Sequence, residues 1–87
     1  MITLDVYSER IGISVENLKS KSRNTEIVVP RQVYWFYLKS QKYNFCEIGR
    51  LFGKSHGTII FGVKRIQNLI DIKDLYIEKY LKAVELI

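Results

Sequence analysis

One stretch of the sequence decides the fold: Ile48-Gly-Arg-Leu-Phe-Gly-Lys-Ser-His-Gly-Thr-Ile-Ile-Phe-Gly-Val-Lys-Arg-Ile66. Just before it, Asn44 and Glu47 have the spacing of a capping box, which predicts a helix running to about Phe52. Gly53 suits a left-handed C-cap, and Ser55 can cap a second helix whose apolar residues recur at helical spacing. Two helices joined by so short a turn predict a helix-turn-helix at about residues 45–69.

The size and composition of the chain restrict what it can be. Its 87 residues are 47% hydrophobic and 26% charged, which predicts one compact domain over residues 1–87 that folds without disulfides or metal. Cys46 is the single cysteine, so it offers neither an internal disulfide nor a zinc site. The sequence has no signal peptide and no apolar run long enough to span a bilayer, so we expect a cytoplasmic protein.

The net charge of +5 is concentrated in the middle of the chain. Residues 19–54 hold eight basic and two acidic residues, whereas the segments on either side are close to balanced. A basic excess next to and inside a helix-turn-helix is typical of a surface that meets a polyanion. A solvated surface explains the charge alone equally well.

The rest of the chain predicts about six helices around one core and no strand, which is an all-α fold. Thr3 can cap a first helix that ends at Gly12, and Ser14 can cap a brief turn. Residues 19–25 are polar and basic, which predicts an exposed loop. The final helix should turn an apolar stripe inward, made of Ile77, Tyr80, Leu81 and Val84.

Pro30 suits the first turn of a helix, which predicts a helix over residues 31–40. The polar arc of this helix holds Arg31, Gln32, Trp35 and Lys39. Apolar residues fill the other positions, so we expect a central, heavily packed helix with one basic face. Trp35 should pack beneath the Arg and Lys stems rather than stack on a base.

Two catalytic interpretations fail, and we do not expect an enzyme. Residues 49–55 resemble a phosphate-binding Walker loop, but they have three residues between the glycines where the motif needs four, and no buried strand precedes them. His56 has no evident nucleophile with a supporting acid, and no metal-ligand partner at helical spacing. We expect no cofactor and no metal.

The helix from His56 has two different faces. One arc is apolar and should be core: Ile59, Val63, Ile66, Leu69 and Ile70. The opposite arc carries His56, Gly57, Ile60, Phe61, Lys64, Arg65 and Asn68. Apolar side chains on such a face can meet thymine methyl groups in a major groove, or they can contact a neighbouring helix of the same domain. Gly57 and Gly62 each cost about 1 kcal/mol relative to Ala, so we expect something to approach them closely.

Three features follow one another along the chain: Arg23, then Pro30-Arg31-Gln32, then Ile48-Gly49-x-x-Phe52-Gly53-Lys54-x-His56-x-Thr58-Ile59-Ile60-x-x-x-Lys64-x-Ile66. In this order they resemble the C-terminal DNA-binding domain of the DnaA replication initiator family, over essentially the whole chain. The resemblance implies a helix-turn-helix related to that of Trp repressor. It also implies binding to duplex DNA at short A/T-rich boxes of the TTATNCACA type.

The resemblance also assigns roles to residues. It implies that Arg23 enters the minor groove, where a narrow A/T tract attracts arginine. Phosphate contacts are implied for Arg31, Gln32 and Lys39. His56 and Thr58 would lie at the start of the recognition helix and Ile60 would pack on thymine methyls, with Lys54 at the basic position before the histidine.

The sequence departs from the family pattern at three positions. Ser55 replaces the usual Asp and cannot be the carboxylate that accepts from a cytosine amino group. Gly57 replaces a usual Ser or Thr, and Gly62 a usual Ser or Ala. Duplex binding is therefore supported better than readout of the consensus box, and the preferred sequence is expected to be shifted or relaxed.

Our leading hypothesis is a monomeric, sequence-preferring DNA-binding module in replication initiation or its control. The expected DNA contacts are Arg23, Arg31, Gln32, Lys39, Lys54, Ser55, His56, Gly57, Thr58, Ile60, Phe61 and Lys64. One alternative is a helical adaptor that docks on a replication protein through Trp35, Ile60 and Phe61; another is a small helix-turn-helix transcription regulator. The ATPase part of an initiator is absent, so we expect either an excised domain or a free-standing protein such as a mobile-element factor, with replication or mobile-element proteins as further partners.

Overall fold

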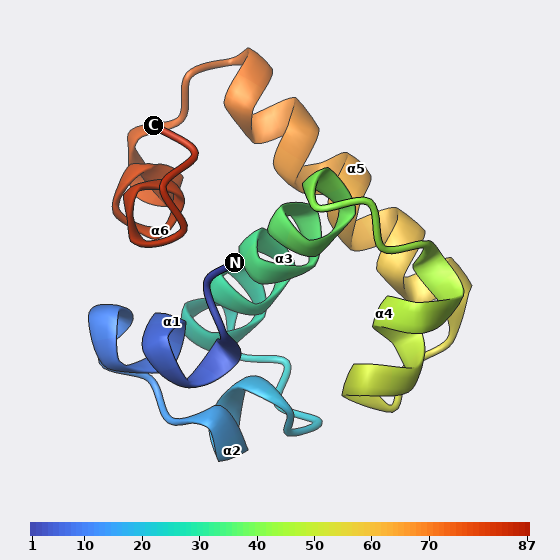
Figure 1. Cartoon of the computed structure of the whole chain (residues 1–87). Helices are drawn as coiled ribbons and strands as arrows, with labels where there is room; N and C mark the ends of the chain where they lie inside the picture. Colours follow the sequence, from blue (N-terminus) through green and yellow to red (C-terminus); the bar gives the residue numbers. More distant parts are fainter.

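The computed structural model describes all 87 residues and contains helices and turns but no strand (Figure 1). The helices are α1 (Leu4–Ile11), α2 (Val15–Leu18), α3 (Thr25–Ser40), α4 (Phe45–Phe52), α5 (His56–Asp71) and α6 (Glu78–Ala83), with a 3-10 turn η1 (Leu75–Ile77) before α6. The predicted all-α fold of about six helices is therefore confirmed.

The predicted capping residues explain where several helices begin and end. At the start of α4, the Asn44 side chain accepts from the Glu47 N–H at 2.8 Å and Glu47 accepts from the Asn44 N–H at 3.0 Å, so the capping box is complete. Gly53 ends α4 in the left-handed conformation with φ 64°. Ser55 then accepts from the Thr58 N–H and starts α5. The helix-turn-helix is α4 and α5.

The predicted start of the helix over residues 31–40 is wrong. α3 begins earlier, at Thr25, because Asn24 accepts from the Glu26 N–H at 3.0 Å and caps the helix. Pro30 lies inside α3, where it lacks one helical hydrogen bond. The added turn buries Val29 in the core. The basic loop is correspondingly shorter and ends at Asn24.

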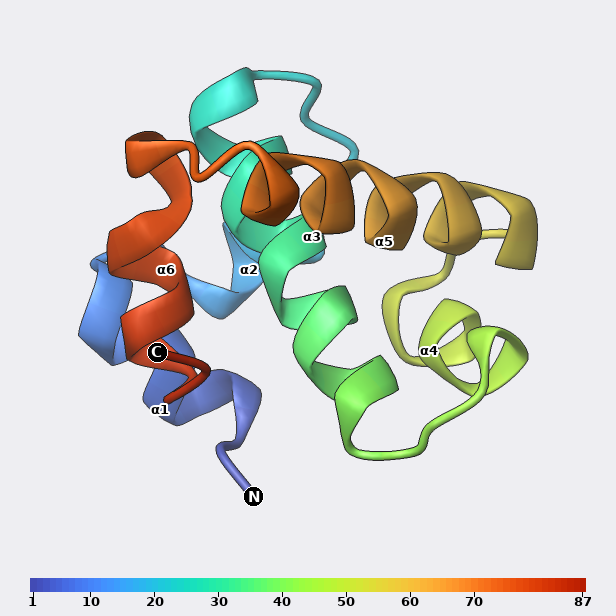
Figure 2. The same cartoon turned by 90° about the horizontal axis from the view of Figure 1, so that it is seen from above.

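α3 lies at the centre of the molecule, and α5 packs across it (Figures 1 and 2). α4 packs against α5, and α6 packs against α1 on the other side of α3. The core that holds these helices together includes Tyr7, Leu18, Val33, Leu38, Ile48, Ile59, Ile66 and the predicted stripe Ile77, Tyr80, Leu81 and Val84. This arrangement fixes the direction of α5 relative to the loop before α3.

Two glycines allow the close approaches on which the helix-turn-helix depends. A Cβ on Gly49 would lie 2.5 Å from the backbone oxygen of Lys54, so only glycine lets the turn return across α4. A Cβ on Gly62 would lie 2.7 Å from the indole of Trp35. Because glycine has no Cβ, α5 can pack directly against α3 at this position. The close approach expected at Gly62 is therefore to a side chain of the protein itself.

Candidate nucleic-acid interface

α5 separates a buried face from an exposed face. Ile59 and Ile66 are completely buried, whereas the other three residues of the predicted core arc are only partly buried. On the opposite face His56, Gly57, Phe61, Lys64 and Asn68 are exposed, and Ile60 and Arg65 are half-buried. Phe61 is 66% exposed. The aromatic ring is thus available for contact with an outside molecule.

The residues at the start of α5 are small, apart from His56. The hydroxyls of Ser55 and Thr58 lie 3.0 Å apart and bond each other, while Ser55 also caps the helix. His56 is exposed beside them. A Cβ on Gly57 would meet nothing within 4 Å, so the expected close approach does not come from this chain. The surface at Gly57 is open to an outside molecule.

The basic loop before α3, residues 19–24, is built by its own serines. The Ser20 hydroxyl donates to the Asn17 oxygen at 2.7 Å and accepts from the Ser22 N–H at 3.2 Å. The Ser22 hydroxyl accepts from the Asn24 N–H at 3.2 Å. Arg23 lies between these bonds with its side chain exposed. The loop therefore presents Arg23 on an ordered backbone.

The expected basic face of α3 is not a surface, which corrects the sequence interpretation. Arg31, Gln32 and Trp35 are 2–5% exposed, because the loop and α5 cover them. Lys39 alone of this arc is exposed, with its Nζ 4.9 Å from the centre of the Phe45 ring. The adaptor hypothesis thus loses one of its three docking residues.

Arg31 uses its guanidinium inside the protein. Its Nε donates to the Leu18 oxygen at 2.7 Å, and its two terminal nitrogens donate to the oxygens of Ser22 at 3.2 Å and Asn17 at 3.3 Å and to the Ser20 hydroxyl at 3.4 Å. No carboxylate faces it, and burial lowers the pKa of Arg31 below its ordinary value. The residue connects α3 to the end of α2 and to the middle of the loop.

A cleft of about 390 Å³ separates the loop from α5. Four cationic residues and no acidic residue line it: Lys21, Arg23, Arg31 and Lys54. Thr58 and Phe61 of α5 line the opposite side. Burial, and then the charges of Arg31 and Lys21, lower the pKa of Lys54. Unopposed positive charges that repel one another in a cleft favour occupation by an anion.

The side of the cleft formed by α3 carries two buried polar atoms that have no partner within the protein. They are Oε1 of Gln32 and Nε1 of Trp35. The indole itself packs against Gly62 and Phe52, with the Trp35 and Phe52 ring centres 5.8 Å apart. Trp35 is thus a packing residue, as expected, although its neighbours are Gly62 and Phe52 rather than only basic stems.

Comparison with known proteins identifies the family of this chain. Residues 3–66 match the family described as the bacterial dnaA protein helix-turn-helix. The chain belongs to this DnaA family. It is similar to the chromosomal replication initiator protein DnaA of Chloroflexus aggregans, 36% identical over 78% of this chain, and to that of Geobacter sulfurreducens, 38% identical over 72%. The aligned part is 15% of each relative's length. No solved structure matches the chain.

Membership of the DnaA family supports DNA binding in replication initiation at the level of the family. The matched region spans α1, α2, the basic loop, α3, α4 and most of α5, and it leaves out η1 and α6. Every residue that lines the cleft lies within it.

The structure brings some predicted site residues together and not others. Arg23, Arg31, Gln32, Lys54, Thr58 and Phe61 all line the cleft. Ser55, His56, Gly57, Ile60 and Lys64 lie on the adjoining surface of α5 or at its cap, and Lys39 lies near the start of α4, outside the cleft. Lys21 was missed, although the basic composition of the loop already pointed to it.

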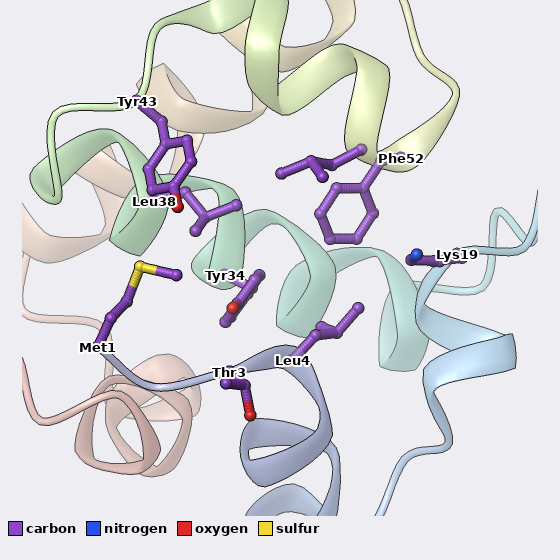
Figure 3. Close-up of a pocket in the computed structure, with 9 residues that line it drawn as sticks. Met1, Thr3, Leu4, Lys19, Tyr34, Leu38, Tyr43 and Phe52 are labelled. Atoms are coloured by element: carbon purple, nitrogen blue, oxygen red, sulfur yellow. The ribbon is translucent and has the colours of Figure 1, made fainter.

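A second hollow, of about 240 Å³, lies between the N-terminal segment, α3 and α4 (Figure 3). Seven of its nine lining residues are hydrophobic; Met1, Leu4, Tyr34 and Phe52 converge on it. The Tyr34 hydroxyl is already used, donating to the Ile2 oxygen at 2.9 Å. This hollow is apolar and lacks the cationic lining of the cleft.

No helix is both long and apolar enough to cross a membrane, and no three potential metal ligands are grouped.

Proposed function

We propose that this DnaA-type chain binds duplex DNA, with α5 in the major groove and Arg23 in the adjacent minor groove. Its role would lie in replication initiation or its control. We further propose that residues 1–87 act as one domain, that they bind as a monomer, and that the site is A/T-rich and related to a DnaA box.

The observation that carries this proposal is the cationic cleft between the loop and α5. In a duplex, one phosphate backbone runs between the major groove and its neighbouring minor groove. A protein that enters both grooves must receive that backbone between its two reading elements. Lys21, Lys54 and the unpartnered indole N–H of Trp35 line the cleft where the backbone would pass. Basic residues there supply affinity without reading sequence.

Base readout would come from the exposed face of α5. Phe61 and Ile60 offer apolar contacts suited to thymine methyl groups, and His56 can donate to or accept from a base edge. Ser55 and Thr58 bond each other, and Gly57 carries no side chain, so polar readout at the first turn is reduced. These features favour a site shifted from TTATNCACA toward thymine contacts.

The test is selection from a random duplex library, followed by titration of the winning duplex at several salt concentrations. We expect an A/T-rich site and a steep loss of affinity with salt. Arg23→Ala should weaken binding and flatten the salt dependence, whereas Lys82→Ala, an exposed lysine of α6, should leave both unchanged. Selection of no site, with the same weak affinity for every duplex, would refute sequence-preferring binding.

A further inference from the structure

We infer that Arg31 is a positioning residue for Arg23: it holds the loop in the conformation that delivers the Arg23 side chain to the minor groove, rather than contacting phosphate itself. The inference rests on the DNA binding proposed above. It assigns to Arg31 a role that the resemblance does not imply.

Arg31 has already used most of its N–H donors. Its Nε and both terminal nitrogens bond the oxygens of Leu18, Asn17 and Ser22 and the Ser20 hydroxyl. The residue is only 4% exposed. A phosphate that took the Nε donor would leave the buried Leu18 oxygen without its partner, which costs free energy.

The acceptors of Arg31 come from two neighbouring segments. Leu18 and Asn17 lie at the end of α2, and Ser20 and Ser22 lie within the loop, so one planar guanidinium connects the end of α2 to the middle of the loop. Ser22 directly precedes Arg23. The backbone direction at Arg23 is therefore set by a bond to Arg31.

Apart from Arg31, mostly local hydrogen bonds hold the loop. Its first residues bond to α2, its serines bond within the loop, and Asn24 caps α3. The other bond from a distant residue is a long one, from Lys54 Nζ to the Ser20 oxygen at 3.4 Å. The loop contributes no side chain to the hydrophobic core. Without the guanidinium, the loop should sample many conformations, and Arg23 would lose entropy on entering a groove.

The experiment is a double-mutant cycle on the selected duplex with wild type, Arg31→Lys, Arg23→Ala and the double variant. Lysine keeps the charge but cannot make four bonds in one plane. We expect each single variant to lose affinity about ten- to hundredfold, and the double variant to lose no more than the weaker-binding single variant. Multiplying losses in the double variant would mean that Arg31 acts on DNA by itself and would overturn the inference.

A second readout separates positioning from general damage to the fold. A duplex in which 2,6-diaminopurine replaces adenine places an amino group in the minor groove, so wild type should bind it more weakly than the adenine duplex. Arg31→Lys should lose this discrimination as Arg23→Ala does. Arg10→Lys is the matched control, because Arg10 also donates to a backbone oxygen, that of Ala83 at 2.9 Å, but far from the loop; it should retain full discrimination.

The loop is also measured without DNA, by ¹⁵N relaxation of residues 19–24. Arg31→Lys, and the milder Ser20→Ala, should raise mobility there while the helices keep their order, as checked by circular dichroism. An equally rigid loop in both variants would overturn the inference whatever the DNA result. If wild type binds no duplex with preference, the proposed function fails and the role of Arg31 in delivering Arg23 fails with it.

Discussion

Gly62 of α5 lies against the indole of Trp35 in α3, so close that a Cβ at this position would come within 2.7 Å of the ring. Trp35 also touches Phe52 at the end of α4, with ring centres 5.8 Å apart. One indole therefore sets the distance of α5 from α3 and contacts both helices of the helix-turn-helix. The orientation of the proposed recognition helix depends on this contact.

Gly62→Ala should lower the free energy of unfolding by about 1 to 3 kcal/mol, because the added methyl must displace a ring that is packed on all sides. Gly57→Ala is the matched control. It adds the same methyl to the same helix in open space and should raise stability by up to about 1 kcal/mol. Urea denaturation of both variants measures the difference, and equal effects would show that Trp35 does not constrain α5.

Gly49→Ala should be the more damaging of the glycine substitutions in the helix-turn-helix. Its Cβ would lie 2.5 Å from the Lys54 oxygen, and a backbone atom cannot move away as a side chain can. The turn between α4 and α5 would have to open, so we expect a loss of more than about 2 kcal/mol and weaker DNA binding. Thermal denaturation checks this, and a melting temperature equal to that of Gly57→Ala would contradict it.

Buried tyrosines should make the fold sensitive to alkaline pH. Burial, followed by the neighbouring Tyr37, Tyr43 and Asp5, raises the pKa of Tyr34 to about 12, and burial also raises the pKa of Tyr7. In the unfolded chain both ionise near pH 10. The stability they provide is therefore complete below pH 10 and is lost as pH rises toward 12. Denaturant titrations at pH 8, 10 and 11 should show this fall, and Tyr34→Phe should reduce it.

Phe61 should read thymine methyl groups if α5 lies in the major groove. Replacing each thymine of the selected site by uracil in turn should weaken wild-type binding at one or two positions by about 1 kcal/mol, since only the methyl is lost. In Phe61→Ala the same replacements should have no effect at those positions. Ile72→Ala, another exposed apolar residue beyond the C-terminal end of α5, serves as the control. A Phe61→Ala variant with the wild-type uracil profile would exclude this contact.

The parts of the fold that local rules govern could be predicted from the sequence. The capping box at Asn44, the left-handed Gly53 and the cap at Ser55 are each satisfied within a few residues, so their spacing was informative. The start of α3 was not predicted, because Pro30 suits the first turn of a helix and the cap at Asn24 was therefore overlooked. Local pattern could place the helix-turn-helix but not the full length of the helix beneath it.

The candidate site was predicted less completely, because burial is a property of the whole molecule. The polar arc of α3 suggested a basic face, yet helix spacing cannot tell whether α5 and a loop will cover that face. Arg31 changed from a surface cation to a buried donor for this reason. Lys21 lines the cleft because the folded chain places the loop opposite α5, which local sequence pattern does not predict.

Simultaneous entry of one monomer into two adjacent grooves is tested most directly by dimethyl sulfate interference on the selected duplex. Methylation of guanine N7 lies in the major groove and that of adenine N3 in the minor groove, so one reaction reports on both. We expect interference in both grooves about half a helical turn apart, and Arg23→Ala should remove only the adenine N3 signal. Interference confined to the major groove in wild type, or an adenine N3 signal that persists in Arg23→Ala, would contradict the account.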